Sequence, residues 1–197
     1  QPRALCKQGL AYHFSESAAN FLERLLEKVN EVSANVTVAQ SRFRRILLQD
    51  STQLRLHPGN APHFKGMGNH AGATSAAKLD VISNLLTGEY FPSRISDGRY
   101  QDRSNGPRIF DYLEPGDLVL RDMGYFDVDS FSRIEELSAS WISRLHALVH
   151  TWDMEGVCLE ERLSSFQGDV LDMDVRLTHK GHRARLIAIR ASEEVKA

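Results

Sequence analysis

The chain has 197 residues, of which 42% are hydrophobic and 25% are charged. This composition is typical of a globular protein and excludes disorder, collagen and coiled coil for the chain as a whole. Lys and Arg (24) nearly balance Asp and Glu (26), so any site for a polyanion must be local. The apolar runs are far shorter than the roughly 20 residues of a membrane-spanning helix. Two isolated cysteines, Cys6 and Cys158, fit a reducing cytoplasm.

The first part of the chain predicts one helix, two strands and a long loop. Apolar residues spaced three and four apart predict an amphipathic helix from Ser15 to about Val32. The apolar run Arg45–Asp50 and the alternating run Ser51–Leu56 predict two consecutive strands. Residues 57–77 are rich in glycine, proline and histidine and have little apolar periodicity, which predicts a loop.

The middle of the chain predicts alternating strands and short helices. Thr87-Gly88-Glu89 predicts the turn of a β-hairpin between Leu79–Leu86 and Tyr90–Ile95. After the hairpin we expect a helix at Ile109–Leu113, a buried strand at Asp117–Asp122, a helix at Asp129–Leu137 and a strand at Ser140–Leu145. This order predicts a mixed α/β sheet with one face covered by helices.

The last part of the chain has a looser pattern. Alternating stretches at Val157–Leu163, Val170–Leu177 and Arg185–Arg190 are separated by glycines and predict a β-rich layer. We therefore expect three regions along the chain: an N-terminal helical segment (1–40), an α/β core (41–150) and a β-rich region (151–197).

Two acidic residues end apolar strands of the predicted sheet, Asp50 the first strand and Asp122 a later one. If these strands are neighbours, the two carboxylates lie side by side at one edge, where a cation between them is needed. Oxygen ligands favour Mg²⁺ or Mn²⁺ over zinc. For an isolated Asp, closing a strand or capping a turn is the commoner role, so the spacing alone does not establish catalysis.

Several segments carry a resemblance to a known family. They are Ile46–Thr52 (ILLQDST), Ile95–Asp102 (ISDGRYQD), Gly116–Phe126 (GDLVLRDMGYF) and the following strand Trp141–Leu145 (WISRL). They resemble the Asp-Asp-Glu (DDE) transposases of bacterial insertion sequences, over roughly Ser15 to the C-terminus. The Asp-x-Gly-Tyr-Phe element and the strand after it are the most specific part.

The resemblance implies an RNase H-like fold in which Asp50 lies on the first central strand and Asp122 immediately precedes x-Gly-Tyr. Both residues would be catalytic and would hold Mg²⁺, or Mn²⁺ in its place. The implied reaction is hydrolysis of the phosphodiester at element ends, followed by joining of the freed 3′ hydroxyl to target DNA. Double-stranded DNA is then the expected partner, a homodimer the expected state of the full-length protein, and the bacterial cytoplasm the expected location. Residues 151–197 would form the family's β-rich insertion, incomplete here.

The third acid of the family has no counterpart in this sequence. It is expected on a helix with a pattern like Tyr-x-x-Arg-Trp-x-Ile-Glu, which does not occur before Ala197. Glu193 and Glu194 lie in a short polar tail without a tyrosine, a tryptophan or an apolar helix face nearby, so we reject both. We therefore expect a catalytic domain that ends before its active site is complete and is inactive alone, marginally stable or self-associating.

A basic stretch near the C-terminus is the best candidate for contact with DNA. Arg176, Lys180, Arg183 and Arg185 occur here without an intervening acid. Such local clusters can neutralise phosphates even in a slightly acidic chain. A solvated charged face is the alternative, and it is as good an interpretation for the arginines at 42–45 and 94–108.

Two hypotheses from different classes follow. The first is a metal-dependent DNA transposase, and the second is a non-catalytic remnant that binds DNA or pairs with itself. A Ser-His-Asp hydrolase is disfavoured because the sequence has no Gly-x-Ser-x-Gly element. Asp97 and Asp102 are expected to be structural, bonding arginines or turn amides.

Overall fold

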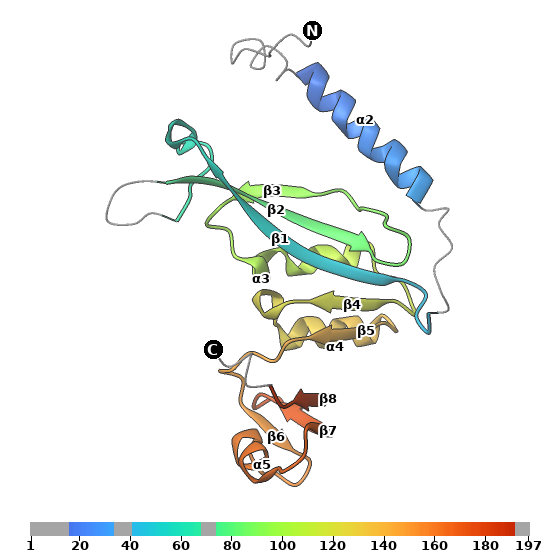
Figure 1. Cartoon of the computed structure of the whole chain (residues 1–197), viewed down its shortest axis with the longest axis vertical. Helices are drawn as coiled ribbons and strands as arrows, with labels where there is room; N and C mark the ends of the chain where they lie inside the picture. Colours follow the sequence, from blue (N-terminus) through green and yellow to red (C-terminus); the bar gives the residue numbers. More distant parts are fainter. Residues whose placement is uncertain (1–15, 34–40, 68–73, 192–197) are drawn as a thin grey trace.

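The computed structural model describes residues 16–33, 41–67 and 74–191. Two sheets organise this part of the chain (Figure 1): a five-stranded sheet in the order β3-β2-β1-β4-β5 and a three-stranded sheet in the order β6-β7-β8. Among these residues, no helix is long and apolar enough to cross a bilayer.

The helices and strands follow in chain order. They are α2 (Glu16–Ser33), β1 (Ile46–Leu56), β2 (Ser75–Asn84), β3 (Arg94–Asp97), α3 (Asp102–Asn105), β4 (Leu118–Arg121), α4 (Val128–Glu136), β5 (Ser140–Ser143), β6 (Thr151–Asp153), α5 (Leu159–Ser165), β7 (Val170–Leu177) and β8 (His182–Ile189). Three short 3-10 helices, η1 (Pro58–Asn60), η2 (Gly106–Asp111) and η3 (Met123–Tyr125), complete the set.

The five-stranded sheet is mixed. Its central strand β1 pairs antiparallel with β2 and parallel with β4, and β4 pairs parallel with β5. On the other side, β2 and β3 are antiparallel. The helices α3 and α4 lie against one face of this sheet (Figure 1). The predicted mixed α/β class with one helix-covered face is thereby confirmed, as is the N-terminal helix.

The first predicted strand pair is one strand. Residues 45–50 and 51–56 were expected to be separate, with Asp50 at a strand end, but β1 continues to Leu56 because β2 pairs with it without interruption from Leu47 to Leu56. The expectation that Asp50 ends a strand is therefore wrong. What ends beside Asp50 is the parallel partner, since β4 stops at Arg121, opposite Gln49.

The hairpin and the loop before it differ from the prediction in their bounds. The turn at Thr87-Gly88-Glu89 is present, and Gly88 has a φ of +72°, a conformation that glycine adopts without steric cost. The second strand of the hairpin begins only at Arg94, after an isolated bridge between Ser83 and Tyr90. The end of the predicted loop at 57–77 belongs to β2, which starts at Ser75, and residues 68–73 lie outside the described residues.

The last part of the chain contains a helix where a strand was predicted. Residues 157–163 were expected to form a strand, but most of them lie in α5, with Cys158 as its N-cap. The alternation over so few residues fits both periods, and two glutamates in the first turn favour the helix through its dipole. The strands expected at 170–177 and 185–190 correspond to β7 and β8, which are antiparallel neighbours.

The core lies between the sheet and its helices. Its residues are apolar and at most 8% exposed: Leu47, Ile82, Ile109, Val119, Phe131, Ile134 and Ala139. Phe131 stacks on Trp141 with the ring centroids 3.8 Å apart. Phe126 packs perpendicular to Phe131, with the centroids of these two rings 5.0 Å apart. This aromatic contact fixes α4 on β5.

We expect Phe131→Ala to lower the free energy of unfolding by about 3–5 kcal/mol, because it removes a buried ring and leaves a cavity between α4 and β5. Urea unfolding of the chain measures the loss. Leu148→Ala is the control, since Leu148 is 82% exposed and its truncation should change the stability by less than about 0.5 kcal/mol. Equal losses in the two variants would contradict this position of the core.

Candidate active site

Asp50 and Asp122 lie at adjacent positions of neighbouring strands. Gln49 on β1 is the register partner of Arg121 on β4; Asp50 is the next residue of β1, and Asp122 directly follows the last residue of β4. The backbone of Asp122 is still extended, with φ of -79° and ψ of -178°. Because side chains alternate between the faces of a sheet and parallel strands are about 4.8 Å apart, the two carboxylates share one face. Asp50 and Asp122 thus follow register partners at the end of the β1–β4 ladder.

Both residues are exposed. In the described part of the chain, the hydrogen bonds of their carboxylates come from backbone amides one or two residues further along the chain. The Asp50 Oδ1 atom accepts a hydrogen bond from the Ser51 amide at 2.8 Å. The Asp122 Oδ1 atom accepts one from the Gly124 amide at 2.9 Å and thereby caps η3. Asp122 therefore has the capping role that is common for a single Asp. This hydrogen bond uses the Oδ1 atom and leaves the Oδ2 atom available to bind a metal ion.

Directly behind these acids, Gln49 and Arg121 form a buried pair. Gln49 is 0% and Arg121 5% exposed. The Gln49 Oε1 atom accepts hydrogen bonds from the Arg121 Nε atom at 3.0 Å and from its Nη2 atom at 2.7 Å. Nη2 also donates to the Gly106 carbonyl oxygen. Burial lowers the pKa of Arg121 from 12.5 to about 10, so the guanidinium remains charged at neutral pH.

Asp80 on β2 supplies the negative charge of this buried cluster. Its carboxylate is fully buried, forms an ion pair with Arg108, and accepts a hydrogen bond from the Tyr125 hydroxyl at 2.6 Å. The Gln49 amide nitrogen donates to the same carboxylate at 3.3 Å. The cluster thus links β1, β2, β4 and η3, which are the segments that carry or adjoin the two candidate acids.

Asp102 lies beside this site, and its side-chain partners are not the arginines that the sequence predicted. Its Oδ1 atom accepts hydrogen bonds from the Ser51 hydroxyl and from the Lys78 ammonium group, the latter at 2.9 Å. Among the described residues, the Asp97 side chain accepts a hydrogen bond from the Lys65 amide, at 3.3 Å. These contacts agree with a structural role for both acids.

The donor set at the site fits a hard divalent cation in part. Two exposed carboxylates on one face supply the oxygen ligands that Mg²⁺ prefers. Within the described ranges, no group of three or more His, Cys, Asp or Glu side chains is close enough to hold a metal ion, so a third carboxylate is lacking there. Glu193 and Glu194 lie outside the described residues.

Comparisons with known proteins identify a family for this chain. Residues 41–192 match the family described as the transposase DDE domain. The chain belongs to this family. Among curated relatives, the transposase of insertion sequence element IS231B from Bacillus thuringiensis subsp. berliner is 30% identical over 149 residues, which is 73% of this chain and 31% of the relative. The IS1151 transposase of Clostridium perfringens is 26% identical over 148 residues, again 73% of this chain and 31% of the relative.

The chain therefore spans about 31% of the length of these transposases. Among solved structures, the piggyBac transposase synaptic complex with hairpin DNA has 10% sequence identity and a TM-score of 0.43, covering 88% of this chain and 39% of that one. The strand order β3-β2-β1-β4-β5, with β2 alone running against the others, is that of the RNase H-like fold implied by the resemblance to DDE transposases.

The basic residues predicted to contact DNA differ in their surroundings. Lys180 is paired with Asp129 at 2.7 Å, and Arg185 makes two hydrogen bonds to Asp172. The Arg176 guanidinium donates to the Met154 carbonyl oxygen at 2.7 Å. Only Arg183 of these four is exposed without an ion pair or hydrogen bond to the described residues. The DDE domain thus presents fewer unpaired cations here than the sequence suggested.

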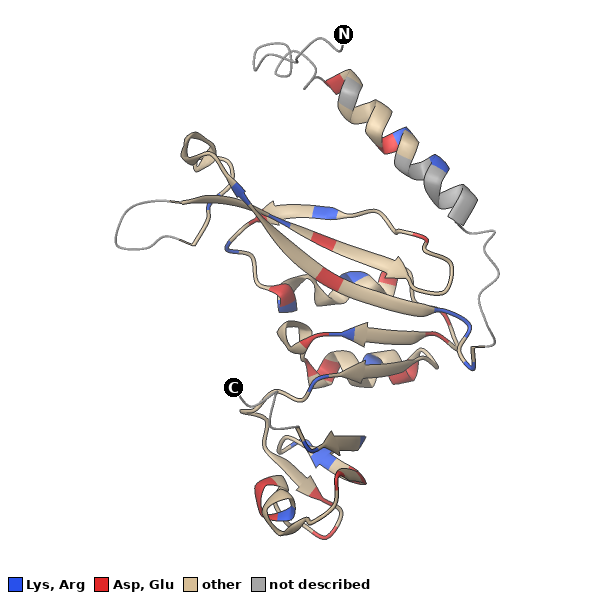
Figure 2. Cartoon of the chain, viewed as in Figure 1, with Lys and Arg blue, Asp and Glu red and all other residues tan. Residues whose placement is uncertain are grey.

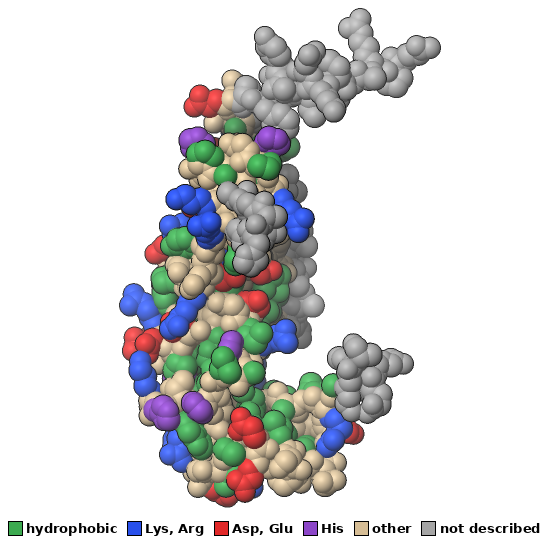
Figure 3. Space-filling model, turned by 90° about the vertical axis from the view of Figure 1, so that its left-hand side faces the viewer, with side chains coloured by type: hydrophobic (Ala, Val, Ile, Leu, Met, Phe, Trp, Pro, Cys, Tyr) green, Lys and Arg blue, Asp and Glu red, His purple; other side chains and the backbone are tan. Residues whose placement is uncertain are grey.

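Arginines of the other two basic stretches are also largely engaged within the protein. Arg45 forms a buried ion pair with Asp117, and Arg103 pairs with Asp127 at 2.7 Å. Positions of basic and acidic residues are interspersed along the ribbon of both sheets (Figure 2), and on the face shown in Figure 3 the Lys and Arg side chains are dispersed among acidic and hydrophobic ones. These contacts favour the structural interpretation for most of the arginines.

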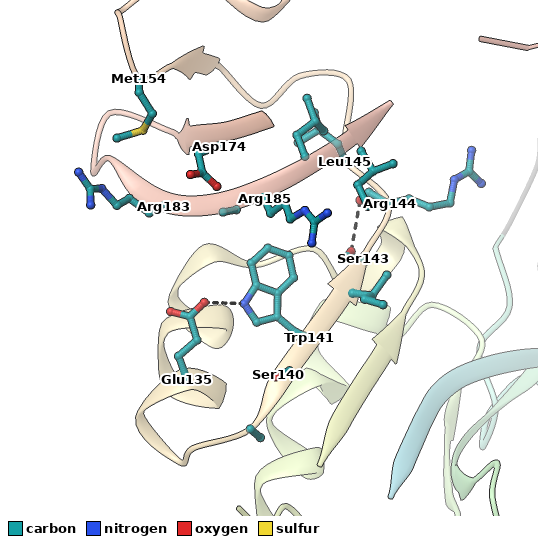
Figure 4. Close-up of a pocket in the computed structure, with 15 residues that line it drawn as sticks. Glu135, Ser140, Trp141, Ser143, Arg144, Leu145, Met154, Asp174, Arg183 and Arg185 are labelled. Atoms are coloured by element: carbon teal, nitrogen blue, oxygen red, sulfur yellow. Dashed lines mark hydrogen bonds between the residues drawn. The ribbon is translucent and has the colours of Figure 1, made fainter. Parts of the chain in front are cut away.

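A groove of about 810 Å³ separates the two sheets, lined mainly by β5 and β8. Figure 4 shows Trp141 at its centre, with the indole nitrogen donating to Glu135 at 2.8 Å, and Arg183 and Arg185 on the opposite wall. Arg183 is therefore the predicted DNA contact that lies free beside an open groove.

Sequence analysis missed Gln49, Asp80, Arg121 and Tyr125 as parts of the site. Each is polar within or beside an apolar strand, which is a detectable conflict because buried polar groups need partners. The run LDVI contains Asp80 and the run VLRD contains Arg121. Opposite charges in two apolar strands, which the structure places on either side of β1, are thus the sequence feature that could have revealed the cluster.

We expect the Tyr125 hydroxyl to make folding sensitive to alkaline pH. Burial and the hydrogen bond to Asp80 raise the pKa of Tyr125 above its ordinary value of 10. A group with a raised folded-state pKa contributes stability below its unfolded-state pKa, and that contribution is lost as the pH rises further. The difference in unfolding free energy between the wild type and Tyr125→Phe should therefore be constant up to about pH 9 and shrink as the pH rises through about 10 and above.

Urea unfolding at a series of pH values measures this difference. Arg121 has a lowered pKa and acts in the opposite direction in both proteins. A difference that stays constant over the whole range would contradict a buried, protonated Tyr125.

Proposed function

We propose that the full-length protein is a transposase that cuts DNA at the ends of an insertion sequence and joins the freed 3′ hydroxyl to target DNA. The observation that carries the proposal is the adjacency of Asp50 and Asp122 on one face of parallel strands in a DDE domain. The chain supplies two acids of this site, and the third would come from a part of the protein beyond the described residues.

The chain's own residues would act by holding and orienting. Asp50 and Asp122 would bind Mg²⁺, with Mn²⁺ as substitute, through carboxylate oxygens that face solvent. Such ions, when bound, supply electrostatic stabilisation of the attacking and leaving oxygens. The capping hydrogen bond from Gly124 fixes one oxygen of Asp122, which limits the rotation of its carboxylate. Two neighbouring carboxylates concentrate negative charge at this edge of the sheet, which favours the binding of a cation.

Double-stranded DNA is the proposed substrate, at both the element ends and the target, and the bacterial cytoplasm is the proposed location. A homodimer would allow both ends of an element to be held together. Residues 151–197 are proposed as part of the family's β-rich insertion, and the small sheet is fastened to α4 by the Lys180–Asp129 ion pair and by a 3.1 Å contact between His182 and Ser132.

The alternative function is a non-catalytic protein that binds DNA or pairs with itself. The observation that favours it is the open face of the five-stranded sheet. Apolar side chains there remain accessible in the described part of the chain, among them Leu54, Ile95 and Ile142, each more than half exposed. An uncovered apolar face of this kind promotes association between copies.

We expect Asp50→Asn and Asp122→Asn, each made in the full-length protein, to lower Mg²⁺-dependent cleavage of element-end DNA more than about 100-fold, since metal ligands matter at least as much as their outer partners. A labelled duplex that carries the DNA at the end of the element measures cleavage. Asp169→Asn is the control, because its side chain is 93% exposed and its nearest cation is Arg190 at 4.0 Å. Cleavage that persists in Asp122→Asn would overturn the proposed site, and duplex binding without cleavage by the wild type would favour the alternative.

Arg183→Ala should weaken binding of a DNA duplex several-fold and reduce the salt dependence of the affinity by about one phosphate contact, because the free guanidinium neutralises a phosphate. Fluorescence anisotropy of a labelled duplex at several salt concentrations measures both. Arg185→Ala is the matched control on the same strand, since Arg185 is already paired with Asp172 and the change should have a smaller effect. An equal effect of the two changes would contradict a special role of Arg183.

A further inference from the structure

Behind the two candidate metal ligands lies the buried pair formed by Gln49 and Arg121. We propose that Gln49 and Arg121 are positioning residues that fix the distance and direction between the carboxylates of Asp50 and Asp122, so that the two acids can share a metal ion. The inference rests on the proposed function, because it assigns a purpose to residues next to the proposed ligands.

The position of the pair along the strands supports this role. Gln49 directly precedes Asp50 and Arg121 directly precedes Asp122, and the two are the last register partners of the parallel β1–β4 pairing. Beyond them no backbone ladder joins β1 to β4, so the side-chain hydrogen bonds between Gln49 and Arg121 are the nearest tie between the segments that bear the acids. Any change in this tie is transmitted across a single peptide unit to each carboxylate.

The hydrogen bonds of the pair also fix the orientation of the Gln49 amide. The Gln49 Oε1 atom accepts from Arg121, so its amide nitrogen must face the Asp80 carboxylate and the Asn105 carbonyl oxygen, to which it donates at 2.9 Å. Shifting β4 by one residue against β1 would turn Arg121 to the open face and Asp122 into the core. The buried Asp80 and Gln49 would then lose partners, which disfavours every register except the one that aligns the two acids.

A charge effect of Arg121 can be separated from a positioning effect because the two have opposite signs. A guanidinium behind the carboxylates repels a divalent cation, so its removal would strengthen metal binding if charge were its only contribution. Loss of positioning would weaken binding instead. Removal of outer hydrogen-bond partners of metal ligands typically costs 10–100-fold in affinity.

The opposite end of the same strand pair offers a matched control. Arg45, just before β1, donates to both carboxylate oxygens of Asp117, just before β4, at 3.0 and 2.6 Å. Asp117 is fully buried, as Gln49 is. This ion pair joins the same two strands four residues away from Gln49 and Arg121, which is about 13 Å along a strand. Its loss should destabilise the protein without altering the arrangement of Asp50 and Asp122.

The experiment measures the affinity of the full 197-residue chain for Mn²⁺ alone by electron paramagnetic resonance of the free ion. The proteins compared are the wild type, Asp50→Asn, Asp122→Asn, Gln49→Met, Arg121→Met, Arg121→Lys and Asp117→Asn. Near-ultraviolet circular dichroism and thermal unfolding establish that each is folded at the temperature used. Arg121→Lys keeps the charge but replaces the planar guanidinium, two nitrogens of which donate to Gln49, with a compact ammonium group. It serves where Arg121→Met does not fold.

We expect Gln49→Met and Arg121→Met to weaken Mn²⁺ binding about tenfold or more, Arg121→Lys to weaken it to a smaller extent, and Asp117→Asn to leave it unchanged despite a lower melting temperature. Unchanged or tighter binding in folded Gln49→Met and Arg121→Met, or in Arg121→Lys, would overturn the positioning role. So would an equal loss in Asp117→Asn.

The outcome for the proposed function is read from different proteins in the same series. If the wild type binds Mn²⁺ and both Asp50→Asn and Asp122→Asn abolish that binding, the metal site is supported. If the Gln49 and Arg121 variants then bind Mn²⁺ as the wild type does, only the positioning inference fails. Wild-type binding that is absent, or indifferent to both Asp changes, overturns the site together with the inference.

Discussion

The parallel pairing of β1 with β4 is the constraint on which the rest of the structure depends. It joins segments about 70 residues apart in the chain, with Leu47 beside Val119 in the core and Gln49 beside Arg121 at the end of the ladder. Parallel strands cannot be joined by a tight turn, so the chain between them forms β2, β3 and the short helices that cover one face. Both the buried core and the adjacency of the two candidate acids follow from this register.

Polar side chains reinforce the pairing at both of its ends. The Arg45–Asp117 ion pair lies at the start of the two strands and the Gln49–Arg121 pair at their end. Buried charges cost desolvation energy, and replacement by apolar side chains is often neutral or stabilising. Such buried polar groups disfavour other strand registers, because a shifted strand would leave each group without a hydrogen-bond partner. The sheet thus has apolar residues for stability and polar residues that define its register.

Sequence periodicity predicted the elements well where the pattern was long or the boundary residue was distinctive. The apolar run predicted as a strand at 117–122 contains β4, and the apolar spacing marked both α2 and α4. The pattern failed for Asp50, because an acid before Ser51 reads as a strand end although β2 pairs straight through it. It failed again at α5, where seven residues are too few to separate a helix from a strand.

The candidate site divides in the same way. Asp50 and Asp122 were predicted because their residue types and the family resemblance point to metal chemistry. Gln49 and Arg121 were not, since their role depends on which strands are neighbours and in what register, and a single sequence does not contain that non-local information. The basic stretch from Arg176 to Arg185 shows a related effect: its cations meet Asp129 and Asp172 only after folding.

A crystal of the chain soaked in Mn²⁺, with anomalous diffraction measured near the manganese edge, tests the central claim most directly. The account predicts an anomalous peak between the carboxylates of Asp50 and Asp122, within coordinating distance of an oxygen of each. Side chains of these two residues on opposite faces of the sheet, or a manganese peak bound elsewhere with none between them, would contradict it.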